Sequence, residues 1–220
     1  MDISVLSPED QALYVSLQAK LQQNAAVSAP TKKPRKRRTQ VKNFTPHEID
    51  LFFKAIDNPR DYAIFRLMYH RGLRASEIGM LQMSNVDMRA ETISFDRLKG
   101  SRSGVGHHMT SNEIRALRAY LKVRGTDPGI LFPSREGKPI SQQRLDQIIK
   151  AYGAKAGLPR EKCHCHTIKH STGTHLRLLR NFTLEDIQHH LGHVNIENTR
   201  KYVDHGGEVQ VERDKRLRSW

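Results

Sequence analysis

"CHCHTIKHSTGTH", residues 163–175, contains both cysteines of the chain, four histidines, a lysine and several hydroxyl side chains. Three interpretations of this stretch lead to three different kinds of protein. It could ligate zinc, it could bind a phosphate at the start of a helix, or it could be only a polar, solvated helix start. The composition and the motifs elsewhere in the chain decide among these interpretations.

Zinc is the first chemistry that cysteine and histidine suggest. Structural zinc sites usually separate paired ligands by about two to four residues and combine two such pairs. Cys163 and Cys165 have a single residue between them, and the chain has no second cysteine pair. A site with two histidines could still use His189 and His193, which lie four positions apart. This spacing makes zinc the weaker interpretation. The sequence also has no P-loop and no carboxylate cluster suited to magnesium, so we expect no metal ion and no other cofactor.

The phosphate interpretation rests on His166 and Lys169, which lie three positions apart near the start of a helix predicted over about 167–180. Residues at this separation can face the same side of the first helical turn. A helix N-terminus also presents free backbone N–H groups and a partial positive charge, which suit a phosphate group. The alternative is a capped helix end in water, which is ordinarily the better interpretation of such a stretch.

The charge of the whole chain favours a polyanionic partner. Its 220 residues include 37 Lys and Arg against 23 Asp and Glu, a formal net charge of +14. Nucleic acid is the commonest partner of so basic a chain, although some basic proteins are merely soluble. With only two cysteines, one residue apart, and no disulfide framework, we expect a reducing compartment and a cytoplasmic, nucleoid-associated protein. No apolar run reaches the length of a membrane span.

The chain is predicted to have three parts. Residues 1–40 form an N-terminal helix, over 8–24, and a flexible basic arm. Residues 41–205 form the folded body, and residues 206–220 form a tail that could dock on a neighbouring protomer or fray. Six residues of the arm are candidates for contacts with DNA phosphates, although nuclear-import signals look similar: Lys32, Lys33, Arg35, Lys36, Arg37 and Arg38.

The body is predicted to be mostly helical. Two capping boxes mark helix starts, Thr45 with Glu48 and Thr110 with Glu113. Between these helices, residues 86–109 have β-branched segments and glycine-rich turns, which indicate a small antiparallel sheet. Further helices are predicted over 59–70, through 75–83, from about 141, and over 167–180, 184–190 and 196–203.

Two further segments change the balance among the interpretations. "RGLRASEIGML" (71–81) and "LGHVNIENTRKYVDH" (191–205), taken with residues 163–175, resemble the tyrosine recombinase (phage integrase) family. The resemblance covers about residues 42–205. It implies a mostly α (α+β) fold, the tyrosine recombinase catalytic domain, in which a helical body carries a small antiparallel β-sheet.

The resemblance also implies a set of catalytic residues. Arg74 takes the place of the family's arginine in a segment like "GLRxSEL", and Lys99 in "LKGSRSG" that of its hairpin lysine. His166 matches the histidine of the His-x-x-Arg motif, and His193 matches the histidine of "LGH". Since 202 − 193 = 9, Tyr202 has the family's spacing for the nucleophile.

One position departs from the family pattern. Lys169 stands where the family has its second arginine, in "HTIKH". Lysine keeps the positive charge but lacks the planar two-pronged fork with which arginine holds a phosphate. Lys169 therefore remains a candidate for the phosphate site, and His170 and Arg177 are neighbours that could compensate for the missing fork. Arg102, in the same loop as Lys99, is a further candidate for DNA contact.

The chemistry of phosphoryl transfer fits these residue types. The reaction needs a nucleophile, positive charge on the non-bridging oxygens and a proton donor for the leaving oxygen. Tyr202 is a weak nucleophile because the pKa of a free tyrosine is about 10, so it needs a nearby base such as His166 or His193. Arg74 can hold the phosphate, and Lys99 can protonate the departing 5′-oxygen.

The resemblance thus implies a site-specific DNA recombinase or integrase that cleaves and rejoins DNA through a 3′-phosphotyrosyl intermediate. Two alternatives remain: a nicking and rejoining activity like that of type IB topoisomerases, and a DNA-binding regulator on a recombinase scaffold whose catalysis is weakened or lost because Lys169 replaces the family arginine. About forty residues precede the body, too few for the separate clamping domain of most integrases. This compact layout is similar to that of fimbrial-switch recombinases. The expected partner is double-stranded DNA at specific sites, bound by a dimer or tetramer on paired sites.

Overall fold

The structure is a computed structural model, and it describes residues 42–97, 106–179, 182–200 and 202. Several predictions fall outside these residues. They concern the helix over 8–24, the six charges of the basic arm, the hairpin residues Lys99 and Arg102, and the tail from residue 206.

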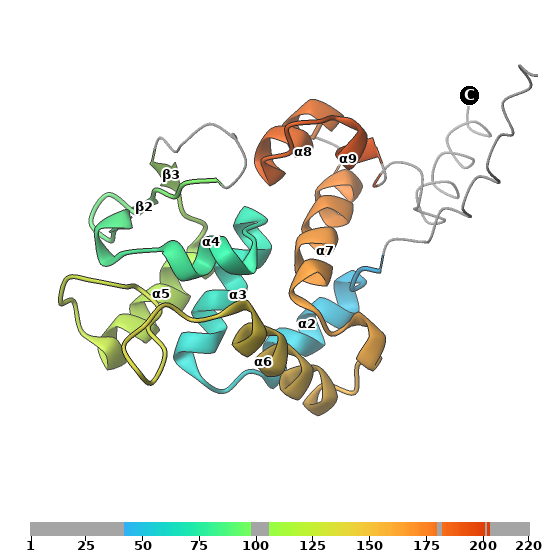
Figure 1. The fold of residues 1–220 in the computed structure, drawn as a ribbon. Coiled ribbons are helices and arrows are strands. Elements are labelled where there is room, and N and C mark those ends of the chain that lie inside the picture. Colours follow the sequence, from blue (N-terminus) through green and yellow to red (C-terminus); the bar gives the residue numbers. More distant parts are fainter. Residues whose placement is uncertain (1–41, 98–105, 180–181, 201, 203–220) are drawn as a thin grey trace, which may run out of the picture. The chain divides into compact units, whose positions relative to one another are not determined.

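The described part of the chain is mostly helical (Figure 1). Its first three α-helices are α2 (Pro46–Ala55), α3 (Pro59–Arg71) and α4 (Ala75–Met80). Three short antiparallel strands follow, in the order β1 (Val86–Asp87), β2 (Thr92–Ile93) and β3 (His107–His108). The remaining helices are α5 (Ser111–Arg124), α6 (Gln142–Lys155), α7 (Cys165–Leu178), α8 (Leu184–Leu191) and α9 (Glu197–Arg200).

Local sequence signals account for most helix starts. At α2, the Thr45 hydroxyl accepts a hydrogen bond from the Glu48 backbone N–H at 3.1 Å, and the Glu48 carboxylate accepts one from Thr45 at 2.8 Å. Thr110 and Glu113 form the same reciprocal pair at α5. Both predicted capping boxes are confirmed.

The start of α7 lies earlier than predicted, at Cys165 instead of 167. The backbone N–H of Cys165 donates to the Asp146 carboxylate of α6 at 3.0 Å. A helix whose first N–H groups are satisfied by another element needs no capping residue of its own. The start is therefore set by tertiary packing, which the local pattern does not contain.

The core is built around α3, which packs against both α5 and α7. Edge-to-face and stacked aromatic rings tie the start of the body to this helix: Phe52 lies 5.2 Å from Phe65 and 5.8 Å from Phe44, between ring centroids. A second, smaller cluster contains Ile187, Leu191 and Tyr202. It covers the C-terminal end of α7, where α8 and α9 lie (Figure 1).

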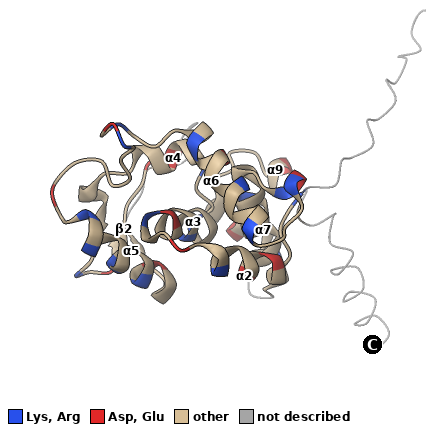
Figure 2. Ribbon diagram, turned by 90° about the horizontal axis from the view of Figure 1, so that it is seen from below, with Lys and Arg blue, Asp and Glu red and all other residues tan. Residues whose placement is uncertain are grey.

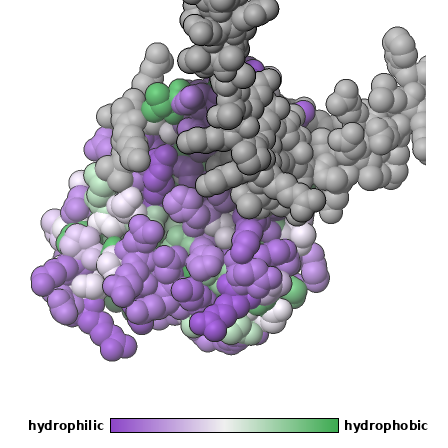
Figure 3. Space-filling view, turned by 45° about the vertical axis from the view of Figure 1, so that its right-hand side comes forward, coloured by the Kyte–Doolittle hydropathy of each residue, from purple (hydrophilic) through white to green (hydrophobic). Residues whose placement is uncertain are grey.

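The surface of the described residues is strongly polar. Lys and Arg occur on several helices, including α3, α5 and α7, and do not gather on a single element (Figure 2). The face seen in Figure 3 carries mainly hydrophilic side chains, with hydrophobic ones scattered among them. No helix in the described ranges is both long enough and apolar enough to cross a membrane.

The ends of α3 and α8 approach each other at Gly72. This glycine ends α3 with φ +57°, the left-handed conformation that glycine adopts without steric cost. A Cβ atom added to Gly72 would lie 2.6 Å from Cδ2 of Leu191. Leu191 is fully buried beside Ile187 and Tyr202, so its side chain has little room to move away. The contact therefore requires glycine on two grounds, its backbone conformation and the space available.

We expect Gly72→Ala to destabilise the fold by more than backbone strain alone explains. The left-handed conformation costs an alanine about 1–2 kcal/mol, and overpacking against Leu191 adds roughly 1–3 kcal/mol. Gly157→Ala is the matched control, because Gly157 has φ +70° and no atom within 4 Å of an added Cβ. Urea denaturation of both variants measures the difference, and equal losses of stability would show that the α3–α8 contact is not tight.

Candidate active site

Arg74 lies in the turn between α3 and α4, directly before α4 begins. Its Nη1 donates to Oε1 of Glu77 at 2.7 Å, and its backbone N–H donates to Oε2 of the same carboxylate at 2.8 Å. The Glu77 side chain is fully buried, whereas that of Arg74 remains 26% exposed. Glu77 thus anchors a guanidinium that is still accessible to a ligand.

Burial alone would raise the pKa of Glu77, but hydrogen bonds from Arg74 and the charges of Arg97 and Lys169 outweigh it and lower that pKa. Glu77 is therefore a carboxylate at neutral pH, surrounded by three cationic side chains. Such an arrangement concentrates positive charge in a partly dry site, where it acts strongly on an anion.

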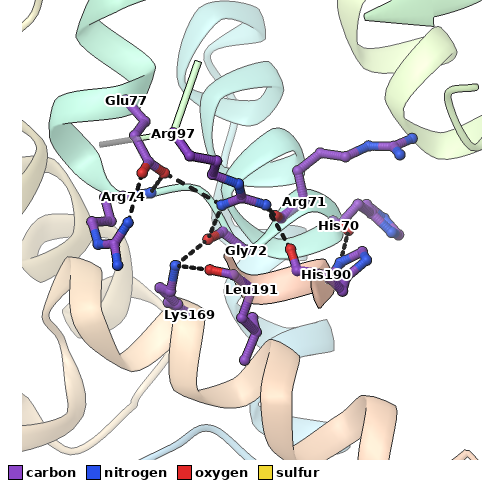
Figure 4. Close-up of polar contacts among 9 residues, drawn as sticks. All are labelled: His70, Arg71, Gly72, Arg74, Glu77, Arg97, Lys169, His190 and Leu191. Carbon is purple, nitrogen blue, oxygen red and sulfur yellow. Dashed lines mark hydrogen bonds and ion pairs between the residues drawn. The ribbon is translucent and has the colours of Figure 1, made fainter. Parts of the chain in front are cut away.

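Arg97, like Glu77, is a residue of this site that the sequence motifs do not identify. Its side chain is 7% exposed. Nη1 donates to the Gly72 carbonyl at 3.1 Å and to Glu77 at 3.4 Å, and Nη2 donates to the carbonyls of Arg71 at 2.7 Å and His190 at 2.6 Å (Figure 4). From the sequence, an arginine just after a short strand is indistinguishable from an exposed hairpin charge. Only the folded chain shows that it is buried.

Lys169 lies in the first half of α7 and is 5% exposed. Its Nζ donates to the carbonyls of Gly72 at 2.8 Å and Leu191 at 2.7 Å (Figure 4). His166, three residues earlier, is exposed. The two residues predicted to share the first turn of α7 thus lie in different environments, one in water and one between the ends of α3 and α8.

Tyr202 is 2% exposed, and its hydroxyl lies 2.9 Å from Nδ1 of His170. Its ring rests on α7 at Gly173, where an added Cβ would lie 2.7 Å from the tyrosine Cε2. The His193 ring lies nearly parallel to the Tyr202 ring, with centroids 6.2 Å apart, and its Nδ1 is 2.9 Å from the Thr199 hydroxyl. Burial raises the pKa of Tyr202 above its ordinary value, and the charge of Arg74 opposes that effect only in part.

The fold thus brings together most of the predicted site residues that the structure describes. His193 stacks on Tyr202, Lys169 is next in sequence to the histidine that contacts the Tyr202 hydroxyl, and the charges of Arg74 and Lys169 act on the same carboxylate. His166 joins the group through its ring, 5.9 Å from that of His170. Lys99, Arg102 and the basic arm lie outside the described residues.

The described ranges contain no set of zinc ligands, because no three of their His, Cys, Asp or Glu residues lie so that they could hold a metal ion together. Cys163 and Cys165 are both buried, and Sγ of Cys163 donates weakly to the Pro159 carbonyl at 3.4 Å. Burial raises the pKa of both thiols. Each therefore stays protonated at neutral pH and packs as a small apolar side chain.

Comparisons with known proteins agree with the motif pattern. Residues 42–208 match the phage integrase family. The type 1 fimbriae regulatory protein FimB of Escherichia coli K12 is 36% identical over 173 residues, covering 74% of this chain and 84% of that protein. Tyrosine recombinase XerA of Pyrococcus horikoshii is 29% identical over 177 residues, covering 78% of this chain and 60% of that protein.

Solved structures share the fold. A crystal structure of XerA recombinase matches with a TM-score of 0.72 and 23% identity, over 97% of this chain and 77% of that one. The Tn1549 transposon integrase in complex with transposon right-end DNA matches with a TM-score of 0.65 and 18% identity, over 97% of this chain and 80% of that one. The predicted mostly α fold with a small antiparallel sheet is confirmed.

His190 makes the junction between α3 and α8 sensitive to acid. Its Nε2 donates to the His70 carbonyl at 2.8 Å, and burial, helped by the charges of Arg97 and Arg71, lowers the pKa of His190 to about 4. The unfolded chain, with a pKa near 6.5, takes up the proton first as the pH falls. The stability that this group contributes is therefore complete above pH ~6.5 and is lost between pH ~6.5 and ~4.

We expect His190→Gln to remove this part of the acid sensitivity, because the glutamine amide can still donate to the His70 carbonyl but does not titrate. Urea denaturation at several pH values should show the stability of the parent falling relative to the variant by about 1.4 kcal/mol per unit of pKa difference. His47→Gln, at an exposed position, serves as control. If the free energy of unfolding depended on pH in the same way for the parent and His190→Gln, His190 would not be the source of this acid sensitivity.

Proposed function

Because this chain belongs to the phage integrase family and is a tyrosine-type site-specific recombinase, we propose that it cleaves and rejoins double-stranded DNA through Tyr202. The observation that carries this assignment is the convergence at Tyr202 of residues from separate segments. His193 stacks on its ring, His170 contacts its hydroxyl, and the charge of Arg74 acts on its pKa.

In the proposed reaction, the Tyr202 hydroxyl gives up its proton and its oxygen attacks the scissile phosphorus. The bond from phosphorus to the 5′-oxygen breaks, and Lys99 protonates that oxygen. A 3′-phosphotyrosyl bond forms and keeps the energy of the broken linkage, so rejoining needs no nucleotide hydrolysis. Arg74, with its accessible guanidinium, is placed to bind a non-bridging oxygen.

Lys169 contributes to the same site in a different way. Its hydrogen bonds go to the Gly72 and Leu191 carbonyls, so its positive charge acts on the phosphate through the electric field of the site and not through a planar fork. In this division of roles, Arg74 binds the phosphate and Lys169 supplies positive charge near it. A lysine can therefore serve at the position where the family has arginine.

The buried Tyr202 hydroxyl needs a base before it can react. His170, whose Nδ1 lies 2.9 Å from that hydroxyl, is the imidazole placed to accept its proton. His193, fixed by its contact with Thr199, supports the tyrosine ring, and His166 lies at the exposed edge of the group. Since burial raises the pKa of Tyr202, binding of DNA should admit phosphate and cationic side chains to this space before cleavage.

DNA binding should depend on charge outside the site as well. The six basic residues of the arm, with Arg102 in the hairpin, are proposed to contact phosphates. Cleaving and rejoining two partners requires paired sites, so we propose a dimer or tetramer on DNA, with the tail from residue 206 docking on a neighbouring protomer. Such an enzyme would work at the nucleoid, in the cytoplasm of its host.

A covalent capture experiment tests the nucleophile. A randomised pool of nicked duplexes, in which the cleaved strand loses a short fragment and cannot be rejoined, is incubated with the protein, and the captured DNA is sequenced to give a cognate duplex. We expect Tyr202→Phe to form no covalent adduct with that duplex while binding it with nearly unchanged affinity, because only one hydroxyl is removed. Peptide mapping of the parent adduct should place the DNA on Tyr202.

Tyr62→Phe is the matched control. Tyr62 lies in α3, and its hydroxyl accepts a hydrogen bond from Arg66 at 2.7 Å. This variant loses a tyrosine hydroxyl outside the site and should form the adduct at the parent rate. An adduct with Tyr202→Phe would overturn the assignment of Tyr202, and failure of the parent to capture any DNA would overturn the proposed activity.

A pair of truncations tests the arm. Deleting residues 1–40 removes the six basic residues, so the slope of log K against log salt should flatten by up to about 0.9 for each phosphate that the arm no longer neutralises. Deleting residues 1–31 leaves all six in place and should keep the slope of the parent. Fluorescence anisotropy with a labelled duplex at several salt concentrations measures both. Equal slopes for the two truncations would show that the cluster does not contact phosphates.

A further inference from the structure

Two helices end at the same place in this fold. Helix α3 ends at Arg71 before Gly72, and α8 ends at Leu191 before Gly192; both glycines have left-handed backbone, with φ +57° and +62°. The last carbonyl groups of a helix lack partners within it and carry a partial negative charge. At this junction, carbonyls from both helix ends point into one buried space (Figure 4).

Two cations bridge these carbonyls. Arg97 donates to the carbonyls of Arg71 and Gly72 at the end of α3 and to that of His190 at the end of α8. Lys169 donates to Gly72 and to Leu191, and so also joins the two ends. We name Arg97, Lys169 and the carbonyls of these four residues the C-terminal bracket. The Gly72 carbonyl is its centre, because it accepts from both cations.

The bracket connects the parts of the proposed active site. Residue 72 is two positions before Arg74, and residue 191 is two positions before His193, from which the chain continues to Tyr202. Arg97 is itself two positions before Lys99. A single buried guanidinium thus contacts both the segment that leads to the phosphate ligand Arg74 and the segment that leads to the nucleophile Tyr202.

We propose that Arg97 is a positioning residue of the recombination reaction, which holds Arg74 and the segment of His193 and Tyr202 in register through the C-terminal bracket. This inference rests on the proposed function of Tyr202. Among the described residues, Arg97 contacts no group that the proposed reaction changes; it acts through the carbonyls of Arg71, Gly72 and His190, and through Glu77, the carboxylate that also anchors Arg74.

The geometry requires arginine at this position. A guanidinium presents its donors in a fixed plane, and Arg97 uses both of its terminal nitrogens to reach two helix ends and one carboxylate. A lysine is a compact charge that can bond one or two of these oxygens but cannot span all of them. Arg97→Lys should therefore keep the positive charge but lose some of these hydrogen bonds, and with them part of the alignment of the two helix ends. Arg97→Met should lose both the charge and the alignment.

The rate of single-turnover cleavage of the captured duplex, at saturating protein, measures how well the reacting groups are positioned. A misplacement of reacting groups by about 1 Å can cost about 100-fold in rate, and we expect a loss of that order for Arg97→Met and a smaller loss for Arg97→Lys. The Kd for the same duplex should stay close to that of the parent. Arg89→Gln is the control, because Arg89 is an exposed arginine between β1 and β2 and should cleave at the parent rate.

Amide hydrogen exchange separates positioning from general loss of stability. If Arg97 holds α8 in register, exchange over 187–193 should accelerate about tenfold or more in Arg97→Lys, while α5 and α6 exchange as in the parent. Uniform acceleration over the whole body would instead show a merely structural role and would overturn the proposal. Parent-like exchange over 187–193, or parent-like cleavage by Arg97→Met, would overturn it as well. Should Arg97→Met not fold, Arg97→Lys provides both measurements.

The exchange measurement also keeps this inference distinct from the proposed function. It needs no DNA, so the effect of Arg97 on α8 is decided even with a chain that captures no duplex. A parent chain without covalent capture contradicts the activity of Tyr202, whereas normal capture with parent-like exchange in Arg97→Lys contradicts only the role of Arg97.

Discussion

The approach of two helix C-terminal ends at Gly72 is the constraint on which this fold depends. Both ends carry partial negative charge and would repel each other across a dry contact. The charges of Arg97 and Lys169 convert that repulsion into attraction, because each donates hydrogen bonds to both ends. Glycine at position 72 gives the backbone the left-handed turn and the space beside Leu191 that the approach needs. This junction thereby joins the end of α8 to the end of α3.

The sequence was sufficient for the elements whose signals are local. The capping boxes at Thr45 and Thr110 are read from neighbouring residues, and the structure has the helices that they predict. The start of α7 was predicted too late, because the group that satisfies its first N–H is Asp146, on another helix. Local patterns determine a boundary only where the satisfying group is itself local.

The sequence predicts those residues of the candidate site that a fixed spacing identifies. It does not predict residues whose role depends on being buried in the folded chain. The nine-residue interval from His193 indicates Tyr202, but nothing in the sequence tells that its ring rests on Gly173 and its hydroxyl on His170. Arg97 was missed for the same reason, since a basic residue beside a glycine-rich hairpin is normally exposed. The roles of Arg97 and Lys169 depend on backbone carbonyl groups. Every residue has such a group, so the residue types do not indicate which carbonyls these side chains contact.

The shared acceptor at Gly72 couples two positions that lie far apart in the sequence. A carbonyl oxygen has two lone pairs, and the Gly72 oxygen accepts one hydrogen bond from Arg97 and one from Lys169, which come from different segments of the chain. A second guanidinium from position 169 would need the space that the first already fills. Positions 97 and 169 are therefore coupled in this chain, because a bulkier group at either position would meet the other at the same oxygen. Lys169 fits beside Arg97 at this oxygen because its compact ammonium group needs less room than a second planar guanidinium.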